Sequence, residues 1–369
     1  MKKIGIVTYH CVDNYGAVLQ AYSLLDTVKT LSGADVEIVD YRPIEITKNY
    51  SFSILPNNLS LIKLISNTLS YPLKKSKNNK FKSFSKKLIK LSKKPDNVLW
   101  DEYDYLIAGS DQVWNPSITR LAPYYLNFPD ITAKKVSYAA SIGKDELSKD
   151  ELCYLSESLK YIDHVSVRES SAIGIVKDIL TKKDVVQVLD PVFLKEPSDW
   201  LKILPKKQRF SNYILVYIME YNSELFDLAL KLSKEENKEI IIVSPNANIK
   251  TVFKSIKLPG KVLYTEGPIE FLELIVNADY ICTNSFHGTA FSIIFQKKFI
   301  TVPHGSRNTR LESILNKLGI ISQQISHDIL ANTDNSHVVQ LFDYDSNVVM
   351  SRLNSLKKES FEFLKEAIK

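Results

Sequence analysis

Five short clusters of polar residues in this sequence each follow a run rich in apolar and β-branched residues. The clusters are Asn14-Tyr15-Gly16-Ala17, Gly109-Ser110-Asp111-Gln112-Val113-Trp114-Asn115-Pro116, Tyr138-Ala139-Ala140-Ser141-Ile142-Gly143, Val167-Arg168-Glu169 and Asn284-Ser285-Phe286-His287-Gly288-Thr289. In open α/β sheets, ligands bind beyond the carboxyl ends of the strands. These clusters therefore hold the candidate catalytic and binding residues.

His287 is the best candidate for proton transfer. It lies between a predicted strand at 280–283 and an apolar helical segment at 290–295, and imidazole gives or takes a proton near neutral pH. Gly288 permits a close backbone approach at the start of this helix, where an anion is favoured. Ser285 and Gly288 are therefore predicted to bind substrate. The alternative is that His287 only braces the turn.

Two carboxylates and three arginines complete the charged candidates. Asp111 and Glu169 each follow a predicted strand, and each is a candidate catalytic carboxylate, with a helix cap or a loop brace as the alternative. Arg168, Arg307 and Arg310 are candidates for anion binding, because a guanidinium binds phosphate and carboxylate groups through paired hydrogen bonds. A solvated surface position is the alternative for an arginine.

Aromatic and amide side chains in the same clusters suit a sugar. Tyr15 and Trp114 are predicted to stack on a sugar ring, because their rings combine an apolar face with a polar tip. Trp114 is equally compatible with a core position, since Val113 precedes it. Asn14 and Gln112 are predicted to hydrogen-bond the hydroxyls of the sugar.

Taken in this order, the clusters resemble the polysaccharide pyruvyl transferase family, whose members carry comparable NYGA, GSDQVWNP, VRE and SxHG motifs. The resemblance spans residues from about Met1 to Gly319. It implies a fold like that of glycosyltransferases with two Rossmann-like domains (glycosyltransferase-B-like). It also implies transfer of a pyruvyl group, as a ketal, from phosphoenolpyruvate to sugar hydroxyls of a cell-surface or exopolysaccharide glycan or its precursor. No metal, nucleotide-sugar donor or other cofactor is implied.

Phe286 occupies the variable position of the SxHG turn, between Ser285 and His287. At this position the turn therefore lacks a positively charged side chain that would bind phosphoenolpyruvate. We expect either that Arg307 or Arg310 supplies the charge, or that Phe286 stacks on the acceptor sugar in a different donor pocket. Two other functions stay open: a nucleotide-sugar-dependent glycosyltransferase, with Glu266 or Glu270 as a ribose ligand, and a non-catalytic glycan-binding relative.

The elements that must position these residues form a βαβ pattern. Strands are predicted at 4–8, 36–40, 105–108, 136–139, 165–167 and 186–188, and then at 213–219, 239–243, 261–264, 280–283 and 299–302. This pattern predicts an α/β protein of two Rossmann-like domains with a cleft between them. The predicted boundaries are 1–195, with a basic helical insertion at about 46–97, then 196–345, and a C-terminal helix at 346–369. Prolines at 191, 197 and 205 mark the junction.

The insertion is the most uneven part of the charge distribution. The chain of 369 residues has a net charge of +6, yet residues 74–94 contain ten lysines and residues 46–95 contain no Asp or Glu. A peripheral contact with an anionic membrane is one prediction, with Leu88, Ile89 and Leu91 as an apolar stripe. A solvated helix covering the first domain is the alternative. The modest total charge does not indicate nucleic acid.

Three dispersed cysteines and short apolar runs indicate the compartment. Cys11, Cys153 and Cys282 form no CxxC pair, which argues against a disulfide framework and a zinc site. No apolar run approaches the roughly 18 residues that span a bilayer. We therefore expect a cytoplasmic protein, which could also bind peripherally to the inner face of the membrane.

Overall fold

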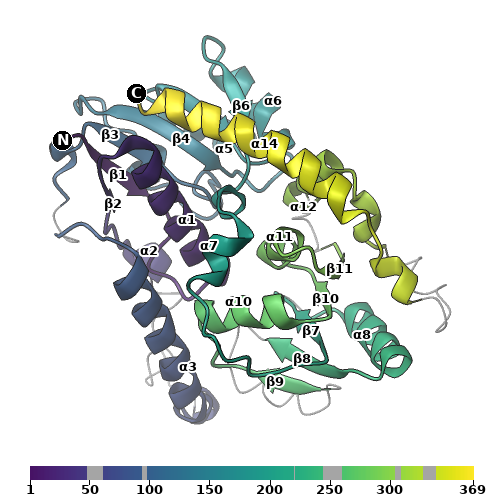
Figure 1. Ribbon diagram of the computed structural model, residues 1–369. Coiled ribbons are helices and arrows are strands. Elements are labelled where there is room, and N and C mark those ends of the chain that lie inside the picture. The colour runs from purple at the N-terminus through teal and green to yellow at the C-terminus, as the bar shows by residue number, and fades with distance from the viewer. Residues whose placement is uncertain (48–60, 94–97, 220, 244–259, 304–308, 327–337) are drawn as a thin grey trace.

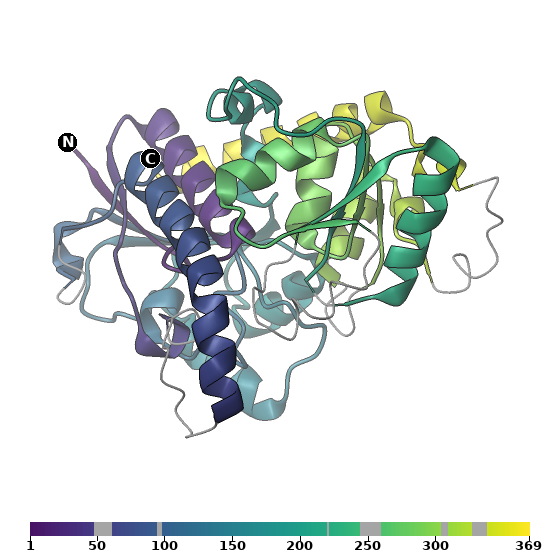
Figure 2. The same ribbon diagram turned by 90° about the horizontal axis from the view of Figure 1, so that it is seen from below.

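The computed structural model describes residues 1–47, 61–93, 98–219, 221–243, 260–303, 309–326 and 338–369. They form two sheets with helices packed on them (Figure 1, Figure 2). All eleven strands predicted from the sequence are present, and the α/β architecture of two Rossmann-like domains is confirmed.

The first sheet contains six parallel strands in the order β2-β1-β3-β4-β5-β6. They are β1 (Lys3–Val7), β2 (Asp35–Ile38), β3 (Tyr105–Ala108), β4 (Lys134–Ala140), β5 (His164–Val167) and β6 (Val185–Gln187). β1, β3 and β4 are buried over nearly their whole length, as expected for strands covered on both faces.

The second sheet contains five parallel strands in the order β11-β10-β7-β8-β9. They are β7 (Tyr213–Tyr217), β8 (Glu239–Val243), β9 (Lys261–Leu263), β10 (Tyr280–Thr283) and β11 (Lys298–Thr301). The predicted boundary after residue 195 falls in the connection between β6 and β7; that boundary stays a prediction.

The helices follow the strands in the βαβ pattern. Along the first sheet they are α1 (Tyr15–Ser32), α2 (Ile44–Thr47), α3 (Leu61–Leu88), η1 (Trp100–Glu102), α4 (Ala122–Tyr125), α5 (Lys149–Ser158) and α6 (Ser170–Ile179). The connection holds η2 (Pro191–Leu194) and α7 (Pro197–Leu201). The second sheet is accompanied by α8 (Ser223–Glu236), α10 (Pro268–Asn277), α11 (Phe286–Ile294), α12 (Thr309–Leu318), η3 (Ile321–Gln323) and η5 (Val339–Phe342). Helix α14 (Ser346–Ala367) ends the chain.

Both sheets reverse their strand order at one point. In the first sheet the reversal lies between β1 and β3, and in the second between β7 and β10. Loops on the two sides of such a reversal diverge and leave a crevice beyond the strand ends. The fold therefore offers two crevices, one at each sheet.

Helix α3 confirms the predicted helical insertion but corrects the predicted apolar stripe. Its inward side carries Phe81 and Phe84, which are buried in the same core as α1 and α10, and Figure 2 shows α3 beside α1. Ile89 is buried, and Leu88 and Leu91 pack against that core. These three side chains therefore stabilise the fold instead of facing outward. Among the residues described, no helix has the length and apolar character needed to cross a bilayer.

Candidate active site

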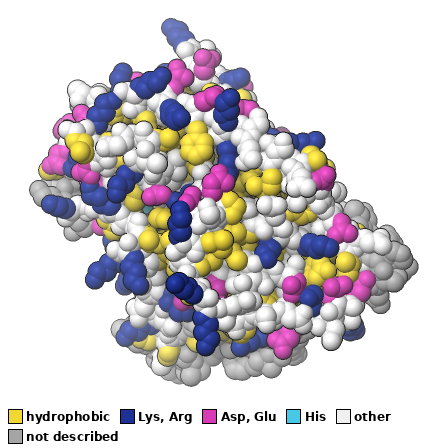
Figure 3. Space-filling view, viewed as in Figure 1, with side chains coloured by type: hydrophobic (Ala, Val, Ile, Leu, Met, Phe, Trp, Pro, Cys, Tyr) yellow, Lys and Arg dark blue, Asp and Glu magenta, His cyan; other side chains and the backbone are white. Residues whose placement is uncertain are grey.

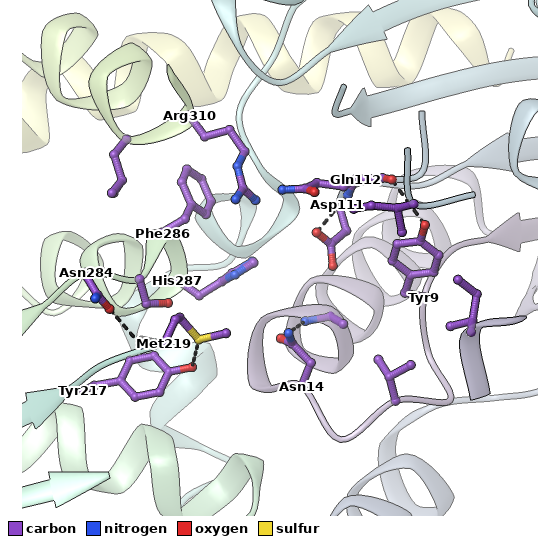
Figure 4. A pocket seen from close by; sticks show the side chains of 16 residues that line it. Tyr9, Asn14, Asp111, Gln112, Tyr217, Met219, Asn284, Phe286, His287 and Arg310 are labelled. Atoms are coloured by element: carbon purple, nitrogen blue, oxygen red, sulfur yellow. Dashed lines mark hydrogen bonds between the residues drawn. The ribbon is translucent and has the colours of Figure 1, made fainter. Parts of the chain in front are cut away.

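A cavity of about 320 Å³ lies where the crevices of the two sheets meet. From the first sheet it is lined by Tyr9, Val12, Asn14, Ala17, Ile46, Asp111, Gln112 and Ile118; from the second by Tyr217, Met219, Asn284, Ser285, Phe286, His287, Arg310 and Leu311. These side chains surround one space in Figure 4. Six of the residues predicted from the sequence line it: Asn14, Asp111, Gln112, Ser285, His287 and Arg310.

Three helices begin at this cavity. Asn14 precedes the first turn of α1, and its side chain accepts a hydrogen bond from Ala17 N (3.2 Å). Ser285 does the same for α11, accepting from Gly288 N (3.4 Å). Helix α12 begins at Thr309, next to Arg310. Because a helix N-terminus carries about half a positive charge, the three together create a positive potential in the cavity.

His287 lies in the first turn of α11 and reaches across to α1. Its ring packs so closely on Gly16 that a Cβ placed there would lie 1.9 Å from Nδ1. On its other side, Nε2 lies 3.7 Å from Asp190 Oδ2. The glycine of the NYGA motif is therefore what allows the histidine of the SxHG motif to enter the space between the sheets.

Asp190 is a buried carboxylate that was not predicted as a site residue; it directly precedes Pro191, which marks the predicted domain junction. Its Oδ2 accepts hydrogen bonds from Arg168 Nη1 (2.6 Å) and Ser110 Oγ (3.0 Å). Burial alone would raise the pKa of Asp190, but His287 and Arg168 outweigh it and hold the pKa well below its usual range. Asp190 follows β6 in the same way that the five clusters follow their strands. This position after a strand could have identified it from the sequence.

Asp111 enters the cavity from a strained backbone. Its φ is 77°, in the left-handed region that residues other than glycine seldom adopt. Its Oδ1 accepts a hydrogen bond from Gln112 N (2.9 Å). Figure 4 shows the Asp111 carboxylate, the His287 ring and the Arg310 guanidinium around the same space. Strain of this kind is typical of functional sites.

Arg310 lies at the edge of the cavity against Gln112. The side-chain amide of Gln112 is oriented with its oxygen toward the guanidinium. This oxygen accepts hydrogen bonds from Arg310 Nη1 (3.2 Å) and Nη2 (2.9 Å). This contact links α12 of the second half to the loop after β3. Arg307, the other predicted anion ligand of this segment, lies outside the described residues.

The sequence model of the polysaccharide pyruvyl transferase family matches residues 14–306, which is most of the chain. The chain belongs to this family. A search of curated protein sequences gives no match. As a member of the pyruvyl transferase family, the chain is a transferase of polysaccharide biosynthesis.

Solved structures agree in fold. S. aureus MnaA, solved with UDP, is 12% identical with a TM-score of 0.51, and the match covers 97% of this chain and 97% of that chain. UDP-GlcNAc 2-epimerase from Methanocaldococcus jannaschii is 10% identical with a TM-score of 0.50, covering 96% and 92%. Anabaena Alr3699/HepE in complex with UDP is 11% identical with a TM-score of 0.50, covering 99% and 100%. This transferase therefore has the glycosyltransferase-B-like fold expected from its sequence.

Arg168 does not line the main cavity, and its contact with the substrate stays a prediction. It is buried behind Phe286, with its guanidinium carbon 4.8 Å from the centre of that ring, and it pairs with Asp190. It borders a second, small cavity of about 20 Å³ instead. Phe286 itself lines both cavities.

Glu169 makes the contacts of a loop brace, the alternative left open by the sequence, and its catalytic role stays a prediction. It is fully buried, and its Oε1 accepts hydrogen bonds from Ile142 N and Gly143 N (both 2.8 Å) and from Ser141 Oγ (3.1 Å). It thereby holds the loop after β4 and does not line the main cavity.

Three further residues predicted to contact the substrate make packing contacts in the structure, and their contact with a substrate stays a prediction. Tyr15 is buried and stacks on Phe271 with ring centres 4.4 Å apart, so it is not open to a sugar. Trp114 is fully buried in the core. Gly288 does not line the cavity; a Cβ there would lie 2.5 Å from Thr283 Oγ1, so its role is close packing of α11.

The sequence analysis missed three polar or polarisable side chains of the lining and gave no role to a fourth. The three are Tyr9, Tyr217 and Met219, and the fourth is Asn284, which belongs to one of the five clusters. Tyr9 follows the strand predicted at 4–8, so the strand-end rule applied there would have found it. Tyr217 and Met219 fall inside the strand predicted at 213–219, whereas β7 ends at Tyr217, so the rule could not select them. Among the described residues, no group of three or more His, Cys, Asp or Glu side chains is placed to hold a metal ion.

Proposed function

We propose that this transferase moves a pyruvyl group from phosphoenolpyruvate to two hydroxyls of a sugar in a cell-surface or exopolysaccharide glycan or its precursor. The observation that carries the proposal is the convergence of the N-termini of α1, α11 and α12 on one cavity that also holds His287 and Arg310. Phosphoenolpyruvate carries a phosphate and a carboxylate. Helix N-termini and a guanidinium are the groups that bind such anions.

The chemistry needs one acid and one base. His287 gives a proton to the methylene carbon of phosphoenolpyruvate while an acceptor hydroxyl bonds to the neighbouring carbon. Asp111 takes the proton that this hydroxyl loses. A second hydroxyl then bonds to the same carbon and gives its proton back to His287. The bond from that carbon to the phosphate oxygen breaks, and the leaving phosphate takes the proton held by Asp111. The products are a cyclic ketal and inorganic phosphate.

Thermal unfolding with candidate donors tests the binding part of the proposal. A ligand that binds only the folded state stabilises it by about 2.7 kcal/mol at 100 times its Kd. We expect phosphoenolpyruvate to raise the Tm and UDP not to. Arg310→Gln should weaken the effect, whereas Arg120→Gln, which removes a guanidinium paired with Asp150 outside the cavity, should not.

Incubation with phosphoenolpyruvate and a panel of sugars tests the reaction. Acceptor-dependent phosphate release together with a pyruvylated sugar in the mass spectrum is the expected result. Stabilisation by UDP alone would favour a nucleotide-sugar glycosyltransferase. Sugar binding without phosphate release from any acceptor would favour a non-catalytic relative.

We also propose that α3 brings the enzyme to an anionic membrane surface. Lys75, Lys82, Lys86 and Lys87 are exposed on this helix, and Figure 3 shows Lys and Arg side chains gathered over it. Near such a surface a lysine contributes about 1 kcal/mol. Since the apolar side chains of α3 pack inward, the contact would be electrostatic and therefore weakened by salt.

Sedimentation with vesicles at low salt tests this contact. The protein should sediment with phosphatidylcholine–phosphatidylglycerol vesicles and not with phosphatidylcholine alone. Changing Lys75, Lys82, Lys86 and Lys87 to Gln should abolish sedimentation. The matched control changes four exposed lysines elsewhere, Lys206, Lys207, Lys358 and Lys365. Equal recovery with both vesicle types would refute the contact.

A further inference from the structure

Asp190 is a buried acidic group beside the cavity that the proposed proton transfers do not use. It is 1% exposed and does not line the main cavity. Its Oδ1 accepts a hydrogen bond from Val192 N (3.1 Å) and thereby caps the start of η2. Its Oδ2 accepts from Arg168 and Ser110 and faces His287 Nε2 at 3.7 Å. The first oxygen therefore anchors the residue, and the second collects the polar contacts.

The partners of Asp190 come from separate strand ends. Ser110 follows β3, Arg168 follows β5 and Asp190 follows β6, all in the first sheet. His287 follows β10 in the second sheet. Arg168 and Ser110 thus fix a first-sheet carboxylate at the point where the histidine from the other sheet arrives.

His287 Nε2 has no hydrogen-bond partner among the described residues, and the nearest carboxylate to it is that of Asp190. The opposite ring nitrogen, Nδ1, is on the side of Gly16 and the start of α1. Asp111 and Arg310 are the other charged side chains that line the described cavity. Nε2 therefore faces Asp190. Nδ1 faces the start of α1, where a bound anion is favoured.

We propose that Asp190 is a positioning residue that keeps a proton on His287 Nε2, fixes the orientation of the ring and stabilises the ring when it is protonated. This inference rests on the proposed role of His287 in proton transfer. Arg168 pairs with Asp190 and keeps it ionised, so that the carboxylate acts as an acceptor. Ser110 orients the oxygen that faces the histidine.

Asp190→Asn tests the proposal, because it keeps the shape and removes the charge. Loss of the carboxylate that holds a catalytic histidine in its tautomer lowers kcat by up to about 10⁴-fold, and we expect a loss in kcat with little change in the KM for phosphoenolpyruvate. A neighbouring carboxylate favours the protonated ring. The alkaline side of the kcat–pH profile should therefore move to lower pH in the variant.

Glu273→Gln is the matched control. Glu273 is another buried carboxylate paired with an arginine, Arg209, but it lies away from the cavity. The Glu273→Gln variant should leave the kcat–pH profile unchanged. Ser110→Ala gives a second variant that keeps the ion pair with Arg168, and it should show a smaller loss with a shift in the same direction. A loss of kcat in Asp190→Asn without a shifted profile would overturn the proposal.

Nitrogen NMR of the histidine ring separates this inference from the proposed function, because the chemical shifts show which ring nitrogen carries the proton. The His287 signals are assigned by their absence from His287→Asn. The native protein should carry the proton on Nε2, and Asp190→Asn should lose this preference, whether or not the enzyme uses phosphoenolpyruvate. An unchanged position of the proton overturns the role of Asp190, whereas a changed position without pyruvyl transfer overturns only the proposed function.

Discussion

At the scale of single residues, the contact between Gly16 and His287 joins motifs from opposite ends of the chain. The space for the imidazole exists because position 16 has no side chain. A larger residue there would displace the ring from its present position. Gly16 therefore serves the site through its size, although it has no chemical group of its own.

Gly16→Ala is expected to lower kcat strongly while the protein stays folded. The new Cβ would lie 1.9 Å from His287 Nδ1, so the ring must move. Gly174→Ala in α6 is the control, because a Cβ there meets nothing within 4 Å. Alanine in an unobstructed helix stabilises by roughly 0.5–1 kcal/mol. Steady-state kinetics and Tm measurements on both variants test this expectation. Normal activity of Gly16→Ala would show that catalysis does not need His287 in its present position.

His287→Asn is expected to lower the rate by about 10²- to 10⁴-fold, because asparagine can hydrogen-bond but cannot transfer a proton. The Tm and its increase with phosphoenolpyruvate should be largely kept. Turnover per folded molecule and Tm are measured on the same preparation. An active but destabilised variant would make His287 a brace for the turn and leave Asp111 as the next candidate for proton transfer.

At the scale of elements, α3 connects the two halves. Lys80 on α3 pairs with Glu270 on α10 (3.1 Å), and Lys77 lies 4.9 Å from the centre of the Tyr15 ring on α1. The insertion is thus a packed element of the fold, and only its outer face carries the exposed lysines. Its buried lysine makes the docking of α3 dependent on pH.

Burial lowers the pKa of Lys77 to about 8, although nearby Asp13 opposes the shift. Because this pKa is below the unfolded value of 10.5, protonated Lys77 costs stability below pH 8. That cost disappears as the pH rises from about 8 to about 10.5. One pKa unit corresponds to about 1.4 kcal/mol. At pH 7 the Lys77→Met variant should therefore be more stable than the native protein by on the order of 1–3 kcal/mol. The gain is reduced because Asp13 loses its positively charged neighbour.

Urea unfolding at pH 7 and at pH 10 measures this effect. The advantage of Lys77→Met over the native protein should shrink at the higher pH. Lys86→Met, at an exposed position of the same helix, should show no such dependence. An advantage of equal size at both pH values would mean that the charge of Lys77 is not the cause.

At the scale of the whole molecule, α14 returns the chain from the second half to the first (Figure 1). It packs on α12 and then on η2 and α1. Lys357 pairs with Glu196 (2.9 Å), and Ser360 Oγ accepts a hydrogen bond from Leu189 N (3.0 Å). Since Leu189 precedes Asp190, the last helix supports the backbone beneath the site.

Ser360→Ala should therefore destabilise the protein, because it leaves the buried Leu189 amide without its partner. An unsatisfied buried donor costs about 1–3 kcal/mol. Ser355→Ala, at an exposed position of α14, is the control and should change stability little. Urea denaturation compares the two, and equal midpoints would show that α14 is not held through this hydrogen bond.

The amino-acid sequence by itself determined the order of strands and helices and the chain segments that form the site. Runs of β-branched residues predict buried parallel strands, and ligands bind beyond the carboxyl ends of such strands. For this reason Asp111, Gln112 and His287 could be selected without a structure. The helical insertion at about 46–97 was also predicted from the sequence.

Only the tertiary structure decided which strand-end side chains reach the cavity. Arg168, Glu169 and Tyr15 also lie in strand-end clusters, but Asp190, the loop after β4 and Phe271 engage them within the protein. Whether a side chain faces a cavity or a partner depends on elements distant in sequence, and local pattern carries no information about them. The position of Asp190 opposite His287 exists only because two sheets meet there.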